Sequence, residues 1–414
     1  MTGRINKKGH LEVGGCDLID LAKEFGTPLY VMDEQTLRDR CRQYVTHFRA
    51  HYPNTEVVYA SKALCTIGIS KIIAGEGLGF DVASGGELFT VLKAGAEPKK
   101  IYFHGNNKSP QEIKEGLKAG IGCFVVDNEQ ELKTLDKLTQ ETGIRANILF
   151  RINPGIEAHT HEFIQTGKID SKFGIQLSDL DRLVQTVKKM KMVELKGFHA
   201  HIGSQILEVK PFAVEAELLL QLTKKYGTEE MNLGGGLGIA YLDQHTPPSI
   251  EHLAKEIAKV FKGKTMAKLI IEPGRSIVGT AGVTLYTIGG IKDIPGVRKY
   301  VFVDGGMADN PRPILYDAKY QAKIANRPEA KKAEKVTIAG RFCESGDKLI
   351  KDIELPKVEG GDVLAVECTG AYNYSMASNY NRVGRPAMVL VNNGDAAVVV
   401  KRETYEDLIA NDAD

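Results

Sequence analysis

The stretch Lys268-Leu269-Ile270-Ile271-Glu272-Pro273-Gly274-Arg275 joins a short apolar run to a carboxylate and a guanidinium. A short apolar run that ends at Pro and Gly is typical of a buried strand. Similar runs precede it with helical patterns between them, which is typical of strand-helix units that build a parallel sheet. The other predicted strands are 57–60, 79–82, 101–103, 123–126, 148–151, 197–200 and 231–233.

The number of predicted strands helps to decide between two kinds of parallel sheet. About eight strand-helix units close a (β/α)8 TIM barrel, whereas an open doubly wound sheet shows the same alternation. Chemically active side chains lie at or just past the carboxyl ends of the strands, among them Lys62, Asp81, His104, His201 and Glu272. Barrel enzymes place their sites on that face. We therefore predict a closed barrel.

A second domain follows the barrel. After Gly279, alternating runs at 283–287, 300–303 and 363–366 recur without long helices between them, which indicates strands. The segment 388–400 predicts a hairpin whose turn contains Asn393-Gly394. We predict the barrel over residues 34–276. Residues 1–33, with a short helix at 18–25 and a strand at 28–31, join residues 277–414 in a β-sandwich or β-barrel domain.

The composition excludes several classes of protein. A chain of 414 residues that is 43% hydrophobic and 26% charged is expected to form two folded domains. Its net charge of +1 and the lack of a basic run argue against nucleic acid or anionic lipid as partners. No apolar run approaches the roughly 20 residues of a membrane span, and the polar start has no signal-peptide core. We expect a cytoplasmic protein with a small-molecule substrate.

The cysteines and histidines do not predict a metal site. Six cysteines lie far apart, with no pair at metal or redox spacing, so neither a zinc site nor a disulfide framework is expected. His159 and His161 have a spacing that can hold a metal, but no further ligands lie near them in the sequence. We predict no metal site.

Three features of the chain suit pyridoxal phosphate, which needs an amine, a phosphate cradle and an acid for its ring nitrogen. Lys62 is the candidate amine, although a lysine at a strand end is usually solvated. Among glycines and aromatics a lysine loses hydration, so its pKa falls and the neutral amine can attack a carbonyl. The run Gly234-Gly235-Gly236-Leu237-Gly238 permits a tight turn, and its N–H groups can also approach a phosphate. Arg275 and Ser204 can add hydrogen bonds to that phosphate.

Glu272, His201 and Cys343 each have a structural and a functional interpretation. Glu272 is either the partner of Arg275 in a salt bridge or the carboxylate that keeps the ring nitrogen protonated. The second interpretation is favoured and points to carbanion chemistry such as decarboxylation. His201 is either a core histidine or a flat ring that stacks on the cofactor. Cys343 is either a small buried residue in a turn or, beside Glu344, a protonated thiol that donates a proton.

With these residues in place, the chain resembles the diaminopimelate decarboxylases. They belong to the alanine-racemase-like, fold type III class of pyridoxal phosphate enzymes, as do ornithine and arginine decarboxylases. The resemblance covers nearly the whole chain. It rests on Tyr59-Ala60-Ser61-Lys62, Cys343-Glu344-Ser345-Gly346-Asp347 and the segments 25–31, 81–87, 170–174, 201–205, 272–275, 309–313 and 370–372. Phe342 and Ala200 depart from the expected pattern without touching a proposed role.

The resemblance implies roles for particular residues. Lys62 would attach the cofactor, Glu272 would hold its ring nitrogen, and Cys343 would donate the proton. The implied cofactor site comprises Lys62, Asp81, His201, Ser204, Gly235, Gly236, Glu272, Pro273, Gly274, Arg275 and Tyr372. The implied substrate site comprises Arg275, Arg312, Tyr316, Glu344 and Tyr372. Cys343 and Glu344 would reach the barrel of a neighbouring subunit, which implies a homodimer with shared active sites.

The resemblance also indicates a substrate. Ornithine enzymes have a Cys-Asp pattern where this chain has Cys343-Glu344. Meso-2,6-diaminopimelate has an amino acid group at each end, so Arg312 and Glu344 would complement its distal carboxylate and ammonium. The implied reaction yields L-lysine and carbon dioxide and is the last step of lysine biosynthesis. The alternatives are a decarboxylase of the ornithine, arginine or carboxynorspermidine type, a racemase, which would place an arginine at the ring nitrogen, and a non-catalytic carrier, which generally lacks the β domain.

Overall fold

A computed structural model describes residues 3–155 and 171–413 of the protein. The chain divides into two compact units. One comprises Met1–Asp39, Ala240–His245 and Ile277–Asp414, and the other comprises Arg40–Ile239 and Thr246–Ser276. The predicted division at residues 34 and 276 stays a prediction, and the grouping of Ala240–His245 is new. His159, His161 and Asp170 lie outside the described residues.

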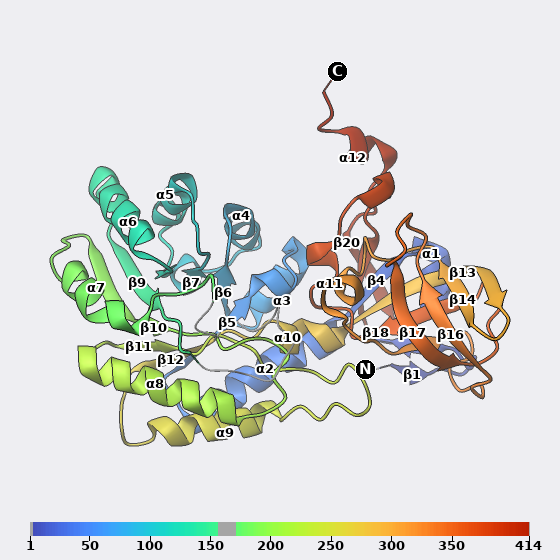
Figure 1. Ribbon diagram of the computed structural model, residues 1–414, viewed down its shortest axis with the longest axis horizontal. Helices are drawn as coiled ribbons and strands as arrows, with labels where there is room; N and C mark the ends of the chain where they lie inside the picture. The colour runs from blue at the N-terminus through green and yellow to red at the C-terminus, as the bar shows by residue number, and fades with distance from the viewer. Residues whose placement is uncertain (1–2, 156–170, 414) are drawn as a thin grey trace. The chain divides into compact units, whose positions relative to one another are not determined.

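The unit that contains Arg40–Ile239 is built around eight parallel strands that close into a barrel (Figure 1). Each strand pairs with the next along the chain, and the pairing of Leu269 with Thr55 closes the ring. Closure confirms the predicted (β/α)8 barrel over the open sheet. The strands are β5 (Thr55–Ala60), β6 (Gly79–Val82), β7 (Ile101–Phe103), β8 (Cys123–Val126), β9 (Ala146–Arg151), β10 (Val193–His199), β11 (Glu230–Asn232) and β12 (Lys268–Ile271).

Helices surround the barrel, and several begin at a side-chain cap. Ser84, Ser109, Asn128 and Ser249 each accept a hydrogen bond from a backbone N–H in the first turn of the helix that follows. The helices of this region are α2 (Glu34–His51), α3 (Ile67–Gly75), α4 (Gly85–Lys93), α5 (Pro110–Ala119), α6 (Glu129–Thr142), α7 (Leu180–Val187), α8 (Lys210–Tyr226), α9 (Ile250–Phe261) and the short α10 (Arg275–Val278).

The other unit contains a nine-stranded mixed sheet. Its main path is β17-β16-β14-β13-β4-β19-β20, and β18 pairs with both β13 and β15. The strands are β4 (Leu29–Asp33), β13 (Gly282–Ile294), β14 (Arg298–Val303), β15 (Ala322–Ile324), β16 (Glu334–Ala339), β17 (Lys348–Leu355), β18 (Val363–Glu367), β19 (Ala387–Asn392) and β20 (Asp395–Val400). A separate small sheet contains β1 (Arg4–Ile5), β2 (Leu11–Val13) and β3 (Cys16–Asp17).

The N-terminal segment is an interior part of this second unit. The fully buried β4 lies between β13, to which it is antiparallel, and β19, to which it is parallel. The predicted hairpin is confirmed, because β19 and β20 pair up to Asn392 and Asp395 around Asn393-Gly394. The predicted helix at 18–25 is confirmed as α1 (Leu18–Phe25), and the unit also contains two short helices that were not predicted, α11 (Arg312–Tyr316) and α12 (Tyr405–Ile409).

Within the described ranges, no helix combines the length and the apolar composition needed to cross a membrane. All six cysteines are described and all are free thiols.

Candidate active site

The carboxyl ends of the barrel strands bring Lys62 and Asp81 together. Lys62 follows β5 in a short 3-10 turn, Ser61–Ala63, and its Nζ lies 3.2 Å from Asp81 Oδ2. The Asp81 side chain is only 1% exposed, whereas the Lys62 side chain is 46% exposed. The expectation of a dehydrated lysine is therefore corrected, since nearly half of the Lys62 side chain is exposed. Asp81 holds the amine in place, because its Oδ2 accepts a hydrogen bond from Lys62 Nζ.

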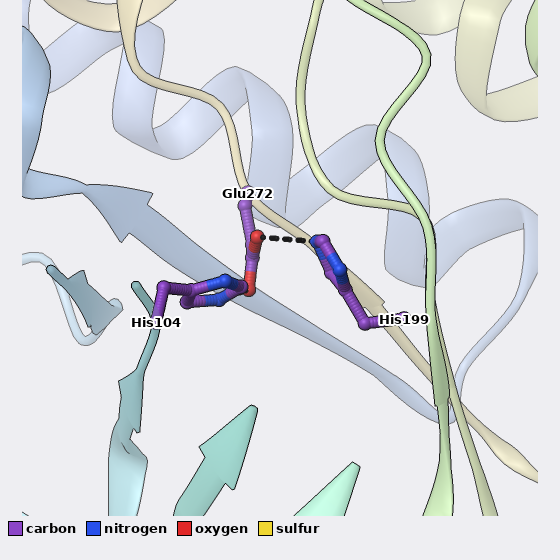
Figure 2. A group of neighbouring side chains, drawn as sticks. All are labelled: His104, His199 and Glu272. Atoms are coloured by element: carbon purple, nitrogen blue, oxygen red, sulfur yellow. Dashed lines mark hydrogen bonds and ion pairs between the residues drawn. The ribbon is translucent and has the colours of Figure 1, made fainter. Parts of the chain in front are cut away.

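Glu272, directly after β12, is buried and held by three side chains (Figure 2 shows two of them). Its Oε1 lies 2.8 Å from His104 Nε2 and accepts a hydrogen bond of 2.6 Å from Asn232 Nδ2. Its Oε2 lies 3.3 Å from His199 Nε2. Burial alone would raise the pKa of Glu272, but His104 and His199 outweigh burial and hold the pKa well below its usual range. The site thus contains a buried, ionised carboxylate.

Both histidines contact the Glu272 carboxylate through Nε2. Burial lowers the pKa of His199 to about 3 even though Glu272 opposes that shift, so the His199 imidazole is neutral. The donor atoms of His104, His199 and Glu272 lie within 4.8 Å of one another, a spacing that a metal ion can also use and that the sequence did not suggest. The amide of Asn232 donates to the same carboxylate. These side chains hold the ionised Glu272 carboxylate in place, and such a carboxylate suits a protonated ring nitrogen.

A glycine-lined wall lies beside Glu272. A Cβ added to Gly235 would lie 2.1 Å from the carbonyl oxygen of Glu272, and one added to Gly274 would lie 3.0 Å from Ala60 Cβ. Gly236 has a φ of +125°, a conformation that favours glycine, and its added Cβ would lie 2.6 Å from the carbonyl oxygen of Gly203. These positions therefore require glycine, because neighbouring protein atoms occupy the space that a side chain would need.

His201, Ser204 and Arg275 complete this wall. The Gly235 N–H donates to His201 Nδ1 over 3.3 Å. Burial lowers the pKa of His201 well below its usual range, so its ring is neutral. Arg275 is only 5% exposed and donates to Ser204 Oγ over 2.9 Å from Nη2 and 3.3 Å from Nε. A buried guanidinium and a neighbouring hydroxyl form a set of donors that suits a phosphate.

The residues of the barrel fit pyridoxal phosphate as a group. Lys62 supplies the amine, Glu272 supplies an ionised acid, and Arg275 beside the glycine wall supplies a cation for the phosphate.

Five predicted residues belong to the unit with the nine-stranded sheet. Arg312 begins α11 and is 5% exposed, and Tyr316 ends that helix. The Arg312 guanidinium carbon lies 4.7 Å from the centroid of the Tyr241 ring, and Nη1 donates to the Tyr320 hydroxyl over 2.5 Å. Within the described residues, no carboxylate forms an ion pair with Arg312. Tyr372 has a φ of +61°, a strained conformation for a tyrosine that often marks a functional site.

The remaining two, Cys343 and Glu344, lie in an exposed loop whose backbone is well anchored. The Cys343 N–H donates to Asn381 Oδ1 over 3.0 Å. The buried Asp347 carboxylate accepts from the backbone N–H of Phe342 over 3.0 Å and of Met307 over 2.7 Å. The interpretation of Cys343 as a buried turn residue was wrong, because its thiol is exposed.

Sequence reasoning missed several residues that shape these sites. His104 was noted at a strand end without a partner, and no role was assigned to His199, Asn232, Tyr241 or Tyr320. One signal was available: His199 and Asn232 are polar residues at the ends of two consecutive predicted strands. The structure pairs them directly on neighbouring strands. Nothing in the local sequence ties them to Glu272.

Comparisons with known proteins agree with this geometry. Residues 35–279 match the family model described as pyridoxal-dependent decarboxylase, pyridoxal binding domain. The diaminopimelate decarboxylase of Synechocystis sp. is 49% identical over 433 residues, which cover 100% of this chain and 92% of that protein. The Bacillus subtilis enzyme of the same name is 47% identical over 425 residues, 99% of this chain and 97% of that protein.

A solved structure supports the same relationship. The diaminopimelate decarboxylase of M. jannaschii in complex with L-lysine superposes with a TM-score of 0.93 at 40% identity, covering 100% of this chain and 98% of that one. Full-length similarity at this level, together with the family match over the barrel, shows that the chain belongs to the diaminopimelate decarboxylase family of pyridoxal-dependent decarboxylases.

Proposed function

We propose that the protein is a pyridoxal phosphate-dependent carboxy-lyase that converts meso-2,6-diaminopimelate to L-lysine and carbon dioxide, the last step of lysine biosynthesis. The observation that carries the proposal is the buried, ionised Glu272 in the same barrel mouth as Lys62 and the glycine wall. The names of the full-length relatives and the lysine complex of a similar structure support the choice of substrate.

The barrel residues divide the work of cofactor binding among them. When bound, pyridoxal phosphate supplies an electron sink for the carbanion that loss of carbon dioxide leaves. Lys62 attaches the cofactor through its amine, and Asp81, 3.2 Å away, holds that amine in position. Glu272 balances a positive charge on the ring nitrogen, which an arginine at this position would oppose. His201 stacks on the ring, while Arg275 and Ser204 bind the phosphate together with the backbone of Gly235, Gly236, Pro273 and Gly274.

The substrate's distal end requires a cation for its carboxylate. Arg312 is buried against tyrosine rings, and no described carboxylate pairs with it. A buried guanidinium is strongly stabilised when a carboxylate binds it through two hydrogen bonds. Ornithine lacks a distal carboxylate and would leave Arg312 without this partner, so diaminopimelate is favoured over the ornithine alternative. Tyr316, Tyr372 and Arg275 are the further residues that we propose for substrate binding.

Cys343 and Glu344 carry a further part of the proposal, a homodimer with shared active sites. Both side chains are exposed, on a loop that Asn381 and Asp347 hold in shape. Because the Cys343 thiol and the Glu344 carboxylate are exposed, both could contact the barrel of a second copy of the chain. There Cys343 would donate the proton to the α-carbon and Glu344 would bind the distal ammonium.

Mixing two inactive variants tests the shared site. Lys62→Ala removes the amine of one site, and Cys343→Ala removes the proton donor. In a mixed dimer, one of the two sites has both residues intact. Equal amounts that exchange subunits should therefore recover about a quarter of the parent activity. No recovery despite subunit exchange, seen by native mass spectrometry, would contradict sharing of Cys343.

We infer a cytoplasmic location. All six cysteines are free thiols, and that of Cys343 is exposed. Reducing compartments keep such thiols from forming disulfides.

The test of the reaction itself is product formation by purified protein with added pyridoxal phosphate. Meso-diaminopimelate, ornithine, arginine and lysine are supplied separately at equal concentration. Turnover of diaminopimelate alone, with lysine as the product, is expected. Turnover of ornithine or arginine instead would refute the role of Arg312, and cofactor binding without any turnover would support a carrier.

A further inference from the structure

We propose that Asn232 is a positioning residue that ties Glu272 to the glycine loop, so that the groups for the two ends of the cofactor stay at a set separation. This inference rests on the proposed function, because it assigns the ring nitrogen to Glu272 and the phosphate to the glycine loop. Asn232 is the last residue of β11, and its side chain is fully buried.

The side chain of Asn232 bridges the two groups directly. Its Nδ2 donates to Glu272 Oε1 over 2.6 Å, and its Oδ1 accepts from the Gly234 N–H over 2.9 Å. The orientation of the amide follows from its partners, because an ionised carboxylate only accepts and a backbone N–H only donates. A backbone bond of 2.7 Å from Glu272 N to Gly234 O completes the link.

The bridge also decides which oxygen of Glu272 faces the cofactor. Oε1 already accepts from both Asn232 and His104, at 2.6 and 2.8 Å. Each carboxylate oxygen has about two acceptor positions, so those of Oε1 are filled. Among the described side chains, Oε2 contacts His199 Nε2 alone, over a longer 3.3 Å. Oε2 is therefore the oxygen available to a protonated ring nitrogen.

An amide is required here because a carboxylate would repel Glu272. In Asn232→Asp, an oxygen of the new carboxylate would lie about 2.6 Å from Oε1, and the pair would have to share a proton. Among the described residues, the other groups that interact electrostatically with Glu272 include His104, His199, His201, Arg151, Glu215, Tyr102 and Cys123. These groups are present in both the parent and the variants, so their titration affects both dissociation constants in the ratio.

The experiment compares Asn232→Leu and Asn232→Asp with the parent. Cofactor dissociation constants are measured by titrating apoprotein with pyridoxal phosphate between about pH 5.5 and pH 9, and each is divided by the parent value at the same pH. Asn147→Asp is the control, because Asn147 is an exposed asparagine on another strand of the same barrel. Urea unfolding of each apoprotein shows whether it is folded.

Two different patterns are expected. Asn232→Leu loses both hydrogen bonds, so its ratio should be about 10 to 100 at every pH, the equivalent of losing a hydrogen bond to a charged group. Asn232→Asp should have a ratio near one at low pH, where the shared proton restores the donor. Its ratio should rise as pH increases and that proton leaves. The ratio for Asn147→Asp should stay near one.

A purely structural role would weaken binding by the same factor in both variants without a pH trend. A pH-independent ratio for Asn232→Asp therefore overturns the inference, as does a ratio near one for Asn232→Leu. If Asn232→Leu does not fold, the pH trend of Asn232→Asp decides alone. Parent protein that binds no pyridoxal phosphate would instead refute the proposed function.

Discussion

Replacing Gly235 with alanine tests the glycine wall with a single methyl group. The new Cβ would lie 2.1 Å from the carbonyl oxygen of Glu272, whereas ordinary contacts begin at 3.4 Å. The glycine loop and Glu272 must therefore separate by about 1.3 Å. These are the groups assigned to the phosphate and to the ring nitrogen, so the cofactor cannot keep both interactions.

The magnitude follows from this displacement. A misplacement of about 1 Å in an active site can reduce activity by about 100-fold. Overpacking of this kind also costs about 1 to 3 kcal/mol of stability, which a folded domain of ordinary stability survives. We expect Gly235→Ala to fold, to bind pyridoxal phosphate much more weakly than the parent, and to lose about 100-fold or more in kcat/KM.

The assay is a cofactor titration followed by decarboxylation at saturating pyridoxal phosphate. Gly75→Ala is the matched control, because Gly75 ends α3 and its added Cβ would meet no atom within 4 Å. That variant should behave like the parent. If Gly235→Ala binds cofactor within about two-fold of the parent, the proposal that this wall sets cofactor position is refuted.

Three further variants probe other parts of the chain. Burial raises the pKa of Asp309 to about 7, so it keeps a proton that the unfolded chain loses above about pH 4. Asp309 should therefore contribute about 4 kcal/mol less stability at pH 7 than at pH 4, and urea unfolding of Asp309→Asn should lack this contribution relative to the parent. Cys343→Ala should lower kcat and leave cofactor affinity unchanged; unaltered kinetics would exclude a proton-donor role. Arg312→Met should raise KM for diaminopimelate about 100-fold with little change in cofactor affinity, and an unchanged KM would remove Arg312 from the substrate site.

Local sequence patterns were sufficient for the strands of the barrel and for part of the other unit. Each barrel strand was visible as a short apolar run, and the hairpin of β19 and β20 was visible from Asn393-Gly394. The placement of Lys62 and Glu272 was also readable, because each follows directly on a strand and strand ends share one face of a barrel. These features depend on residues close together in the chain.

Other features required the tertiary structure. The exposure of Lys62 reversed the expectation of a dehydrated amine, and the grouping of Ala240–His245 with the second unit has no local sequence signal. Tyr241, within that segment, packs on Arg312.

What the sequence by itself determined is therefore the order of elements, the closed barrel and the positions of Lys62 and Glu272. Only the tertiary structure decided what surrounds Glu272. His104 precedes it by 168 residues and Asn232 by 40. The physical reason is that barrel closure brings strands distant in sequence into contact, whereas sequence periodicity reports only which face of an element is buried.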